Sequence, residues 1–307
     1  QQELLNIVIV GGGATGIEVA GILSEMKKFV LPNDYPDMPS SLMHIYLIEA
    51  GPRLLAGMSE ESSAHAEQFL REMGVNILLN KRVVDYRDHK VVLEDGTEIA
   101  TRTFIWVSGV TGVTIGNLDA SLIGRGGRIK VDSFNRVEGM NNVFAIGDQC
   151  IQLADENYPN GHPQLAQVAI QQGELLAKNL IRMEKGQEMK PFHYRNLGSM
   201  ATVGRNRAVA EFSKVKMQGW FAWVMWLVVH LRSILGVRNK VIVLLNWIWN
   251  YFTYDQSMRM IVYARKAKEI RDREKLEETN HLGKELIQEP KQHSPQEIQQ
   301  ASGQEKK

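Results

Sequence analysis

The sequence contains only one cysteine, Cys150, among its 307 residues. A single cysteine cannot form a disulfide or a redox-active pair within the chain, which excludes a disulfide scaffold and a dithiol mechanism confined to these residues. We therefore expect Cys150 to be a small buried residue in a protein of a reducing compartment.

The sequence also lacks a strong excess of charge of either sign, because its formal net charge is +1. This balance argues against nucleic acid as a partner. No leader precedes the first apolar run, which we expect to be a strand over residues 4–10, and we expect the sequence to belong to a longer chain. Hydrophobic residues make up 44% of the sequence, enough for the core of one or two globular domains.

A glycine-rich turn is the first motif that the sequence does contain. In "VIVGGGATGIEVA", Gly11, Gly13 and Gly16 match the spacing G-x-G-x-x-G. Alone, this spacing also occurs in ordinary structural turns. Here it lies between an expected strand and an expected helix, where the helix amides and the helix dipole face a pyrophosphate. This context predicts a dinucleotide-binding loop.

An acidic residue, Glu49, ends the second expected strand, "MHIYLIEA" at residues 43–50. It comes later than the usual ~20 residues after the glycines, because a proline-containing loop, which we expect to end the first helix near Pro32, is inserted before the strand. A carboxylate there accepts both ribose hydroxyls and repels a 2′-phosphate, which predicts NADH rather than NADPH. We expect Arg53 to be a solvated residue on the approach to the next helix.

Glu18 follows the last glycine by two residues, and we expect it in the first turn of the helix. Two interpretations are open from the residues alone. The carboxylate either lies near the nicotinamide end of a bound dinucleotide, or it only interacts favourably with the helix dipole.

The remaining elements follow the pattern of an α/β chain. A helix over residues 59–73 is capped by Ser59, and short alternating segments over residues 82–109 predict a small meander that ends in a buried strand. From Val110 the sequence becomes rich in glycine, which we interpret as a crossing between domains.

A second cofactor-like motif lies in "NVFAIGDQC". We expect a buried strand over residues 143–148 that presents Asp148 at its end, with Gly147 permitting close backbone approach, although an ordinary strand and turn have the same pattern. A long helix over residues 163–183 follows, with a proline in its first turn. We expect His162, directly before this helix, to be exposed to solvent.

The last structured part is rich in tryptophan, after a segment over residues 192–212 that alternates like two strands. Its two longest uncharged runs, residues 219–231 and 241–254, are shorter than the ~20 residues that a spanning helix needs. Tryptophan with flanking arginine and lysine is typical of amphipathic helices in a membrane interface. A transmembrane-like segment near residues 220–254 and a buried hairpin or dimer interface are the alternatives.

In the order and spacing of its motifs, the sequence resembles the type II (non-proton-pumping) NADH:quinone oxidoreductases, within the pyridine nucleotide-disulfide oxidoreductase-like flavoproteins. The resemblance runs from about residue 6 to about residue 262 and rests on "GGGATGIEVAGIL", "IYLIEAGPRLL", "FIWVSGV", "VFAIGDQC", "PQLAQVAIQQG" and the tryptophan-rich close. It implies an α/β fold with two Rossmann-like dinucleotide-binding domains and C-terminal amphipathic helices.

The resemblance also implies two cofactors, NADH and FAD, and no metal. It places a glutamate like Glu18 near the nicotinamide and in catalysis, and an A-Q-x-A-x-Q motif with Gln167 and Gln171 beside the flavin and the quinone entrance. The implied cofactor-binding residues are Gly11, Gly13, Gly16, Glu49, Gly109, Gly147, Asp148, Gln164, Leu165 and Ala166.

Four parts are expected on this basis: an NADH-binding domain (residues 1–110), the remaining part of an FAD-binding domain (111–216), membrane-associating helices (217–263) and a charged, disordered tail (264–307). The family begins with its own strand–glycine–helix unit for the ADP half of FAD. The sequence does not contain that unit, and we expect it to correspond to the C-terminal two-thirds of such an enzyme.

The expected activity is hydride transfer from NADH to FAD and transfer of two electrons to a membrane quinone, without proton pumping. The amides of Gln167 and Gln171 suit hydrogen bonds to quinone carbonyls, although they equally suit a helix face or bonds to backbone. The alternatives are a soluble NADH-dependent flavoprotein reductase with a protein acceptor and a non-catalytic NADH-binding module. We expect a peripheral protein on the cytoplasmic face of the inner membrane, and a homodimer is possible.

Overall fold

The computed structural model describes residues 2–113, 115–213 and 215–253. The expected tail over residues 264–307 lies outside the described residues.

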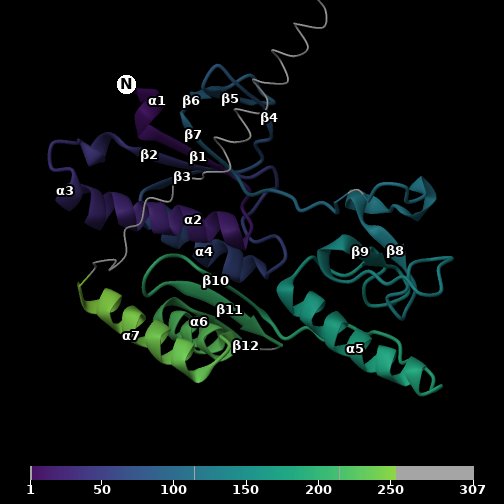
Figure 1. Cartoon of the computed structure of the whole chain (residues 1–307). Helices are drawn as coiled ribbons and strands as arrows, with labels where there is room; N and C mark the ends of the chain where they lie inside the picture. The colour runs from purple at the N-terminus through teal and green to yellow at the C-terminus, as the bar shows by residue number, and fades with distance from the viewer. Residues whose placement is uncertain (1, 114, 214, 254–307) are drawn as a thin grey trace, which may run out of the picture. The chain divides into compact units, whose positions relative to one another are not determined.

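A parallel sheet with the strand order β3-β2-β1-β7 forms the centre of the first domain (Figure 1). Every residue of its inner strand β1 is buried, as expected for a strand that is covered on both faces. The chain continues from β1 to β2 and β3 on one side and adds β7 on the other side of β1, so the strand order reverses at β1, and open α/β sheets bind their ligands at the carboxyl ends of the strands at such a point. The strands are β1 (Asn6–Val10), β2 (His44–Ile48), β3 (Val75–Leu78) and β7 (Thr103–Trp106).

Alternate residues of β1 enter two different cores. Ile7 and Ile9 pack with the helices α2 (Ala14–Glu25) and α4 (Glu60–Glu72), whereas Val8 and Val10 pack with the antiparallel meander. The meander, β4 (Val83–Arg87), β5 (Lys90–Leu93) and β6 (Glu98–Ala100), has the antiparallel pairing expected from the sequence.

Two expected boundaries in this domain are wrong. The first residues form a short helix, α1 (Gln2–Leu5), so the first strand begins at Asn6 and not at Leu4. Pro32 does not end the helical segment after the glycine turn, because α2 continues through a π-helical turn (Met26–Val30) into α3 (Leu31–Asp34). Pro32 lies at the start of α3, where its missing N–H removes no helical hydrogen bond.

The segment after residue 110 contains a two-stranded parallel sheet, β8 (Ile129–Val131) and β9 (Cys150–Gln152), and the long helix α5 (Ala166–Glu184). The expected strand over residues 143–148 is wrong. Phe144 makes only an isolated bridge with Arg136, and a 3₁₀ turn (Gly147–Gln149) follows. The left-handed φ of +65° at Gly147 turns the chain out of the extended conformation, so a strand cannot continue to residue 148.

The helix α5 begins at Ala166, so the expected start at residue 163 is wrong. Pro163 lies outside the helix, and Leu165 is the extended residue that precedes it.

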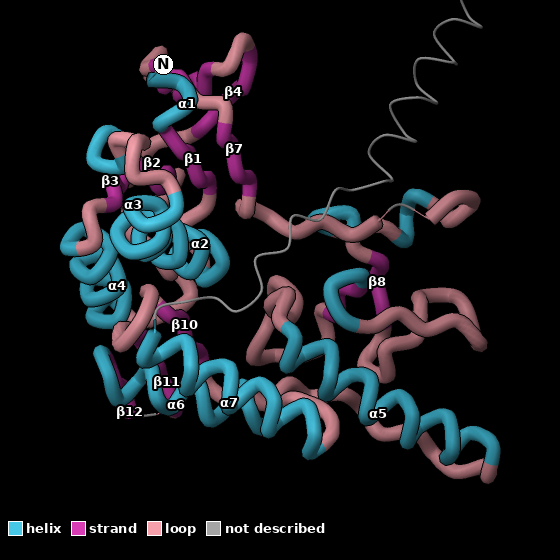
Figure 2. The backbone as a smooth tube through the Cα atoms, turned by 60° about the vertical axis from the view of Figure 1, so that its left-hand side comes forward, coloured by secondary structure: helices cyan, strands magenta, loops and turns pink. Residues whose placement is uncertain are grey.

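An antiparallel sheet and two helices close the described part of the chain (Figures 1 and 2). Two of its strands, β10 (Ser199–Thr202) and β11 (Ala208–Phe212), are those expected within residues 192–212, and a third, β12 (Val215–Gln218), follows that segment. The helices are α6 (Gly219–Ser233) and α7 (Val237–Thr253).

The C-terminal sheet packs directly on the helices of the first domain, since Ala201, Val203 and Val209 belong to the same buried cluster as Ile7 and Ile9. The close approach depends on a glycine. A Cβ on Gly21 in α2 would lie 2.8 Å from the backbone nitrogen of Gly204. The sequence therefore joins these elements into one core.

Candidate functional site

The glycine turn after β1 has a shape that side chains would prevent. Gly11 has a φ of +117° and donates its N–H to the carbonyl of Ile48 at 2.9 Å. A Cβ on Gly16 would lie 1.8 Å from the carbonyl oxygen of Gly11, so helix α2 can approach the turn only with glycine there. Gly13 precedes α2, and a Cβ there would meet no atom within 4 Å, which leaves the helix N-terminus open to a ligand.

Glu49 lies directly beside this turn. Its two carboxylate oxygens accept hydrogen bonds from the N–H of Gly12 at 2.6 Å and the N–H of Gly51 at 2.7 Å. The two amides hold the carboxylate at the end of β2, beside the glycine turn.

Arg53 is not the solvated residue that the sequence suggested. Its guanidinium is partly buried and donates to the carbonyl oxygens of Met58 at 2.8 Å and Ala56 at 2.9 Å, with a longer contact to Leu55 at 3.4 Å. These bonds close the loop before α4 and engage the guanidinium of Arg53 with the carbonyls of that loop.

Glu18 is the fifth residue of α2, so the expectation that it lies in the first turn is wrong. The helix begins as early as Ala14 because Gly13 precedes it in an extended conformation. An interaction with the helix dipole falls off beyond the first turn, so it does not explain this position.

The carboxyl of Glu18 faces the C-terminal sheet. Burial raises the pKa of Glu18, and this effect is opposed by hydrogen bonds with Thr202 in β10 and by the charge of His230 in α6. Glu18 therefore connects α2, the helix that follows the glycine turn, with the tryptophan-rich part of the chain.

The residues of the second motif meet at the N-terminus of α5. Gly147 donates its N–H to the side-chain oxygen of Gln172 at 2.7 Å, and a Cβ on Gly147 would lie 3.1 Å from that of Ala169. Asp148 is exposed, and its carbonyl accepts a hydrogen bond from Gln164 at 3.1 Å.

Three further predicted residues lie on either side of this motif. Leu165 and Ala166 form the open start of α5, where no side chain caps the helix. Gly109 lies in an exposed segment after β7, directly following Ser108, the residue that packs against Gly11.

Gln167 and Gln171 both bond to backbone, as the second interpretation of the sequence allowed. Gln167 donates to the carbonyl of Gly198 at 3.0 Å and accepts from the N–H of Leu197 at 3.1 Å. Gln171 pairs in the same way with both backbone groups of Arg195, at 2.9 and 3.1 Å. Each amide keeps one N–H and one lone pair for another partner.

Sequence reasoning missed Gln172, which is 1% exposed. It lies one residue beyond the A-Q-x-A-x-Q motif, and the spacing of that motif does not predict its burial beside Gly147. Cys150 is buried, as expected, and burial raises the pKa of its thiol.

His162 is 1% exposed, so the expectation that it faces solvent is wrong. Its Nε2 lies 3.0 Å from a carboxylate oxygen of the equally buried Asp155, and the rings of Tyr158 and Phe192 pack around it. Burial alone would raise the pKa of Asp155, but hydrogen bonds from His162 and two backbone amides lower it. This pair is internal to the fold, and Arg128 links it to the second motif by donating to the carbonyls of both His162, at 3.1 Å, and Cys150, at 2.6 Å.

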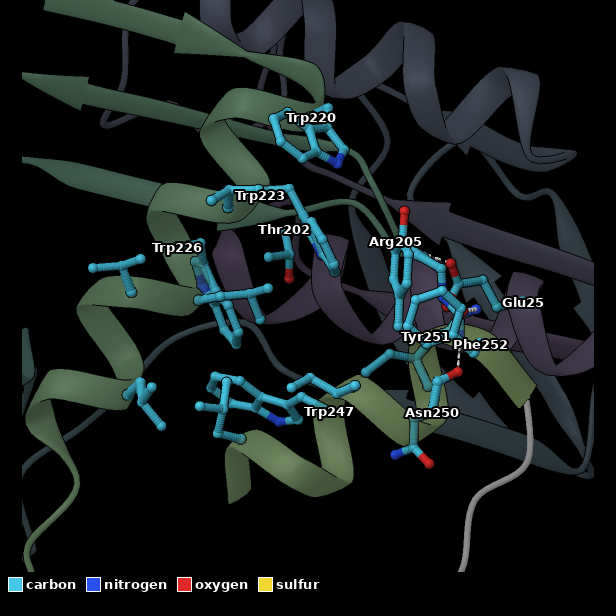
Figure 3. Close-up of a pocket in the computed structure, with 18 residues that line it drawn as sticks. Glu25, Thr202, Arg205, Trp220, Trp223, Trp226, Trp247, Asn250, Tyr251 and Phe252 are labelled. Carbon is cyan, nitrogen blue, oxygen red and sulfur yellow. Dashed lines mark hydrogen bonds between the residues drawn. The ribbon is translucent and has the colours of Figure 1, made fainter. Parts of the chain in front are cut away.

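A groove of about 550 Å³ lies among α6, α7 and β10 (Figure 3). We call it the tryptophan groove, since Trp220, Trp223, Trp226 and Trp247 line it. Thr202, the partner of Glu18, also lines it.

Arg205 fixes one end of the groove. Its guanidinium donates to the carbonyl oxygens of Asn250 at 2.9 Å and Tyr251 at 3.1 Å, in the last turn of α7 (Figure 3). A cation at the negative end of a helix dipole is favourable, so Arg205 attaches α7 to the turn between β10 and β11.

Several large apolar side chains of the two helices remain exposed, among them Phe221 at 72% and Phe252 at 76%. Within residues 2–113, 115–213 and 215–253, no helix combines the length and the apolar character required to cross a bilayer.

Two known protein families are similar in sequence to most of the described chain. A profile of the family described as pyridine nucleotide-disulphide oxidoreductase matches residues 1–173, and one described as NDH2 C-terminal domain matches residues 196–254.

Two curated relatives show the extent of the likeness. The type II NADH:quinone oxidoreductase NdhA of Mycobacterium tuberculosis is 35% identical over 260 residues, covering 80% of this chain and 54% of its own. The mitochondrial internal alternative NAD(P)H-ubiquinone oxidoreductase A1 of Arabidopsis thaliana is 32% identical over 269 residues, covering 82% of this chain and 52% of its own. The chain thus spans about half the length of these relatives.

Among solved structures, NDH2 from Plasmodium falciparum in complex with NADH matches with a TM-score of 0.74 and 20% sequence identity, covering 82% of this chain and 66% of that one. This likeness concerns the fold, and it confirms the expected α/β class with a Rossmann-like parallel sheet and C-terminal helices.

Proposed function

The chain belongs to the pyridine nucleotide-disulphide oxidoreductase family, and from this premise we propose that it serves as a type II NADH:quinone oxidoreductase, which oxidises NADH and reduces a membrane quinone without pumping protons. The observation that carries the proposal is the position of Glu18. It lies on the helix that begins at the glycine turn, and its carboxyl is close enough to Thr202, which lines the tryptophan groove, for that residue to lower its pKa.

NADH fits the turn after β1. Gly11 and Gly16 permit the close packing of turn and helix, and Gly13 leaves the amides at the start of α2 accessible to a pyrophosphate. Glu49 is held by two backbone amides at the position where a carboxylate accepts ribose hydroxyls and repels a 2′-phosphate. These features support NADH as the preferred nucleotide.

The residues at the start of α5 suit one part of an FAD-binding site. Gly147, with its positive φ, and the exposed Asp148 lie beside the uncapped N-terminus of that helix, which favours negative charge. We propose that these two residues, with Gln164, Leu165 and Ala166, hold the flavin, and that Gly109 contributes from the segment after β7. Bound flavin would supply a two-electron carrier between the nicotinamide and the quinone.

The residues of the chain itself supply orientation and protons. Gln167 and Gln171 fix the segment of residues 195–198 against α5, so they act first as positioning residues, and the N–H that each amide retains is available to a quinone oxygen. Glu18 has a raised pKa, which suits a carboxyl that holds a proton and passes it on when the quinone takes up its two protons.

The amphipathic helices support a location at a membrane surface. Tryptophan prefers the interface between headgroups and acyl chains, and α6 and α7 carry exposed apolar side chains with Arg232, Arg238 and Lys240 between them. We propose a peripheral attachment through this part of the chain, on the cytoplasmic face of the inner membrane.

Steady-state kinetics test the proposal. The chain, supplied with FAD and bound to vesicles that contain a quinone, is expected to oxidise NADH at a rate that rises with the quinone content of the vesicles. Activity that needs a soluble acceptor protein and ignores the vesicles would instead indicate a soluble reductase. Binding of NADH without any turnover would indicate a non-catalytic module.

A further inference from the structure

A second, polar hollow of about 350 Å³ adjoins the tryptophan groove. We call it the basic hollow. It is formed by the end of α2, the π-helical turn, the end of α4 and the turn between β10 and β11, and its lining includes Ser24, Lys28 and Arg207. Glu25 and Arg205 line both the hollow and the groove, so the two spaces meet at these residues.

We propose that the groove and the hollow together bind one anionic phospholipid, with an acyl chain in the tryptophan groove and the phosphate in the basic hollow. The proposal rests on the membrane contact proposed above, because that contact brings lipid to this surface.

The charge of the hollow supports an anionic occupant. Its acids already have partners: Glu72 pairs with Arg207 at 3.5 Å and accepts a hydrogen bond from Gln68 at 3.0 Å, and Glu25 accepts the backbone N–H of Arg205. Lys28 is exposed at the rim and stands over the ring of Phe29 at 5.2 Å. The lining therefore carries one more base than acids, which matches the single negative charge of a phosphodiester.

Two residues that line the hollow, Ser24 and Asn206, each carry a buried polar side-chain atom, and these support a specific headgroup. Ser24 is 4% exposed, and neither its hydroxyl nor the side-chain oxygen of Asn206 has a hydrogen-bond partner among the residues that the structure describes. A buried polar atom without a partner is costly, and a bound ligand removes that cost. The Ser24 hydroxyl suits a phosphate oxygen, whereas the Asn206 oxygen only accepts and suits a hydroxyl, as in a glycerol headgroup.

The groove supplies the apolar part of the site. Its lining is mainly tryptophan, leucine, isoleucine and valine, and Arg205 holds its far wall, α7, in place. A lipid chain is as apolar as leucine, so leaving the bilayer for this groove changes its environment little. Selectivity must therefore come from the hollow, and binding should depend on the headgroup more than on the acyl chain.

Native mass spectrometry of the chain in detergent tests the proposal directly. The chain is incubated with phosphatidylglycerol or with phosphatidylcholine of identical acyl chains. We expect one phosphatidylglycerol to be retained per chain. Phosphatidylcholine should bind about fivefold more weakly, because it lacks the net negative charge and one charge interaction near a membrane surface has about this effect. Equal retention of the two lipids would overturn the proposal. Displacement of the lipid by inorganic phosphate at equal concentration would also overturn it, by showing a site for a free anion.

Matched variants locate the site. Lys28→Gln should weaken phosphatidylglycerol binding about fivefold, whereas Lys178→Gln, which removes the same charge from the exposed face of α5, should not change it. Equal losses in both variants would show unspecific attraction and overturn the proposal. Co-sedimentation with vesicles reports on the membrane contact separately: vesicle binding without a retained lipid contradicts this site alone, and a retained lipid without vesicle binding contradicts the membrane contact alone.

Discussion

The carboxylate of Glu211 in β11 accepts a hydrogen bond from the backbone N–H of Ser59, 3.0 Å away, at the residue that caps α4. It also accepts from the hydroxyl of Ser59 and, at 2.6 Å, from the hydroxyl of Ser62. A carboxylate at a helix N-terminus is favoured by the dipole and by the free amides there. One side chain of the C-terminal sheet thereby completes a helix of the nucleotide-binding domain.

Replacing this acid should weaken the joint between the two parts. We expect Glu211→Gln to lower the free energy of unfolding by about 1–3 kcal/mol at pH 7, because a charge-assisted set of hydrogen bonds becomes neutral and partly unmatched. Urea denaturation measures the loss. Glu174→Gln, an exposed acid on α5, is the matched control and should leave the unfolding free energy unchanged.

The pH dependence of the unfolding free energy provides a second test of the role of Glu211. Burial alone would raise the pKa of Glu211, but the hydrogen bonds from Ser59 and Ser62 lower it. A carboxyl whose pKa is lowered on folding contributes stability above its ordinary pKa of about 4.3 and loses it as the pH falls through the folded value. The wild type and Glu211→Gln should therefore converge in strongly acidic buffer. A constant difference between them would contradict the assignment.

Glu18 should show the opposite behaviour. Because burial raises its pKa, the ionised form is disfavoured in the folded chain, and stability falls as the pH rises through the ordinary value toward the raised one. Glu18→Gln resembles the protonated form, so we expect a higher unfolding temperature than the wild type at pH 8 and no difference near pH 4. Differential scanning calorimetry at the two pH values measures this.

The same substitution should slow quinone-dependent turnover while leaving the affinity for NADH nearly unchanged, since Gln at this position cannot carry a proton. Thr202→Val removes the side-chain hydrogen bond, one of the interactions that oppose the effect of burial, and leaves the backbone hydrogen bond in place, so it should shift the pH profile of turnover slightly to higher pH. Equal losses of turnover and NADH affinity in Glu18→Gln would indicate a purely structural role.

Nucleotide preference should depend on Glu49. In Glu49→Gln, one amide partner, Gly12 or Gly51, faces an NH₂ group instead of an oxygen, and the repulsion of a 2′-phosphate is lost. We expect the ratio of kcat/KM for NADH over NADPH to fall about tenfold, which corresponds to roughly 1.4 kcal/mol. The exposed Glu94→Gln serves as control. An unchanged ratio in Glu49→Gln would show that another group sets the preference.

The positioning role of Gln167 can be separated from contact with a quinone. In Gln167→Glu the group facing the carbonyl of Gly198 changes from a donor to an acceptor, so the two oxygens repel. We expect faster hydrogen exchange at the amides of residues 197 and 198 in the absence of any quinone. Gln187→Glu, at an exposed position after α5, should leave this exchange unchanged. If exchange stays slow while turnover falls, Gln167 acts by touching the substrate.

Much of the nucleotide-binding domain could be predicted because its signals are local. The spacing of Gly11, Gly13 and Gly16, the continuous apolar run of β1 and the Ser59 cap each depend on neighbours in the sequence. The boundary errors also have local causes, since Pro32 is compatible with a helix start and Gly147 turns the chain out of the extended conformation.

The candidate site could be predicted only in part, because several side chains take their roles from contacts that the spacing of the sequence does not indicate. His162 is adjacent to proline and looks exposed, yet Asp155 and three aromatic residues enclose it. Arg53 binds carbonyls of its own loop, and Gln172 is buried against Gly147. No period or spacing encodes these contacts, which arise when separate elements pack.

The measurement that tests the central claim most directly is the visible spectrum of the chain after addition of FAD, recorded without oxygen. We predict that flavin absorbance appears with the protein, is bleached by NADH, and returns when a soluble quinone is added. Bleaching that a quinone does not reverse, or a protein that binds NADH but takes up no flavin, would contradict the account.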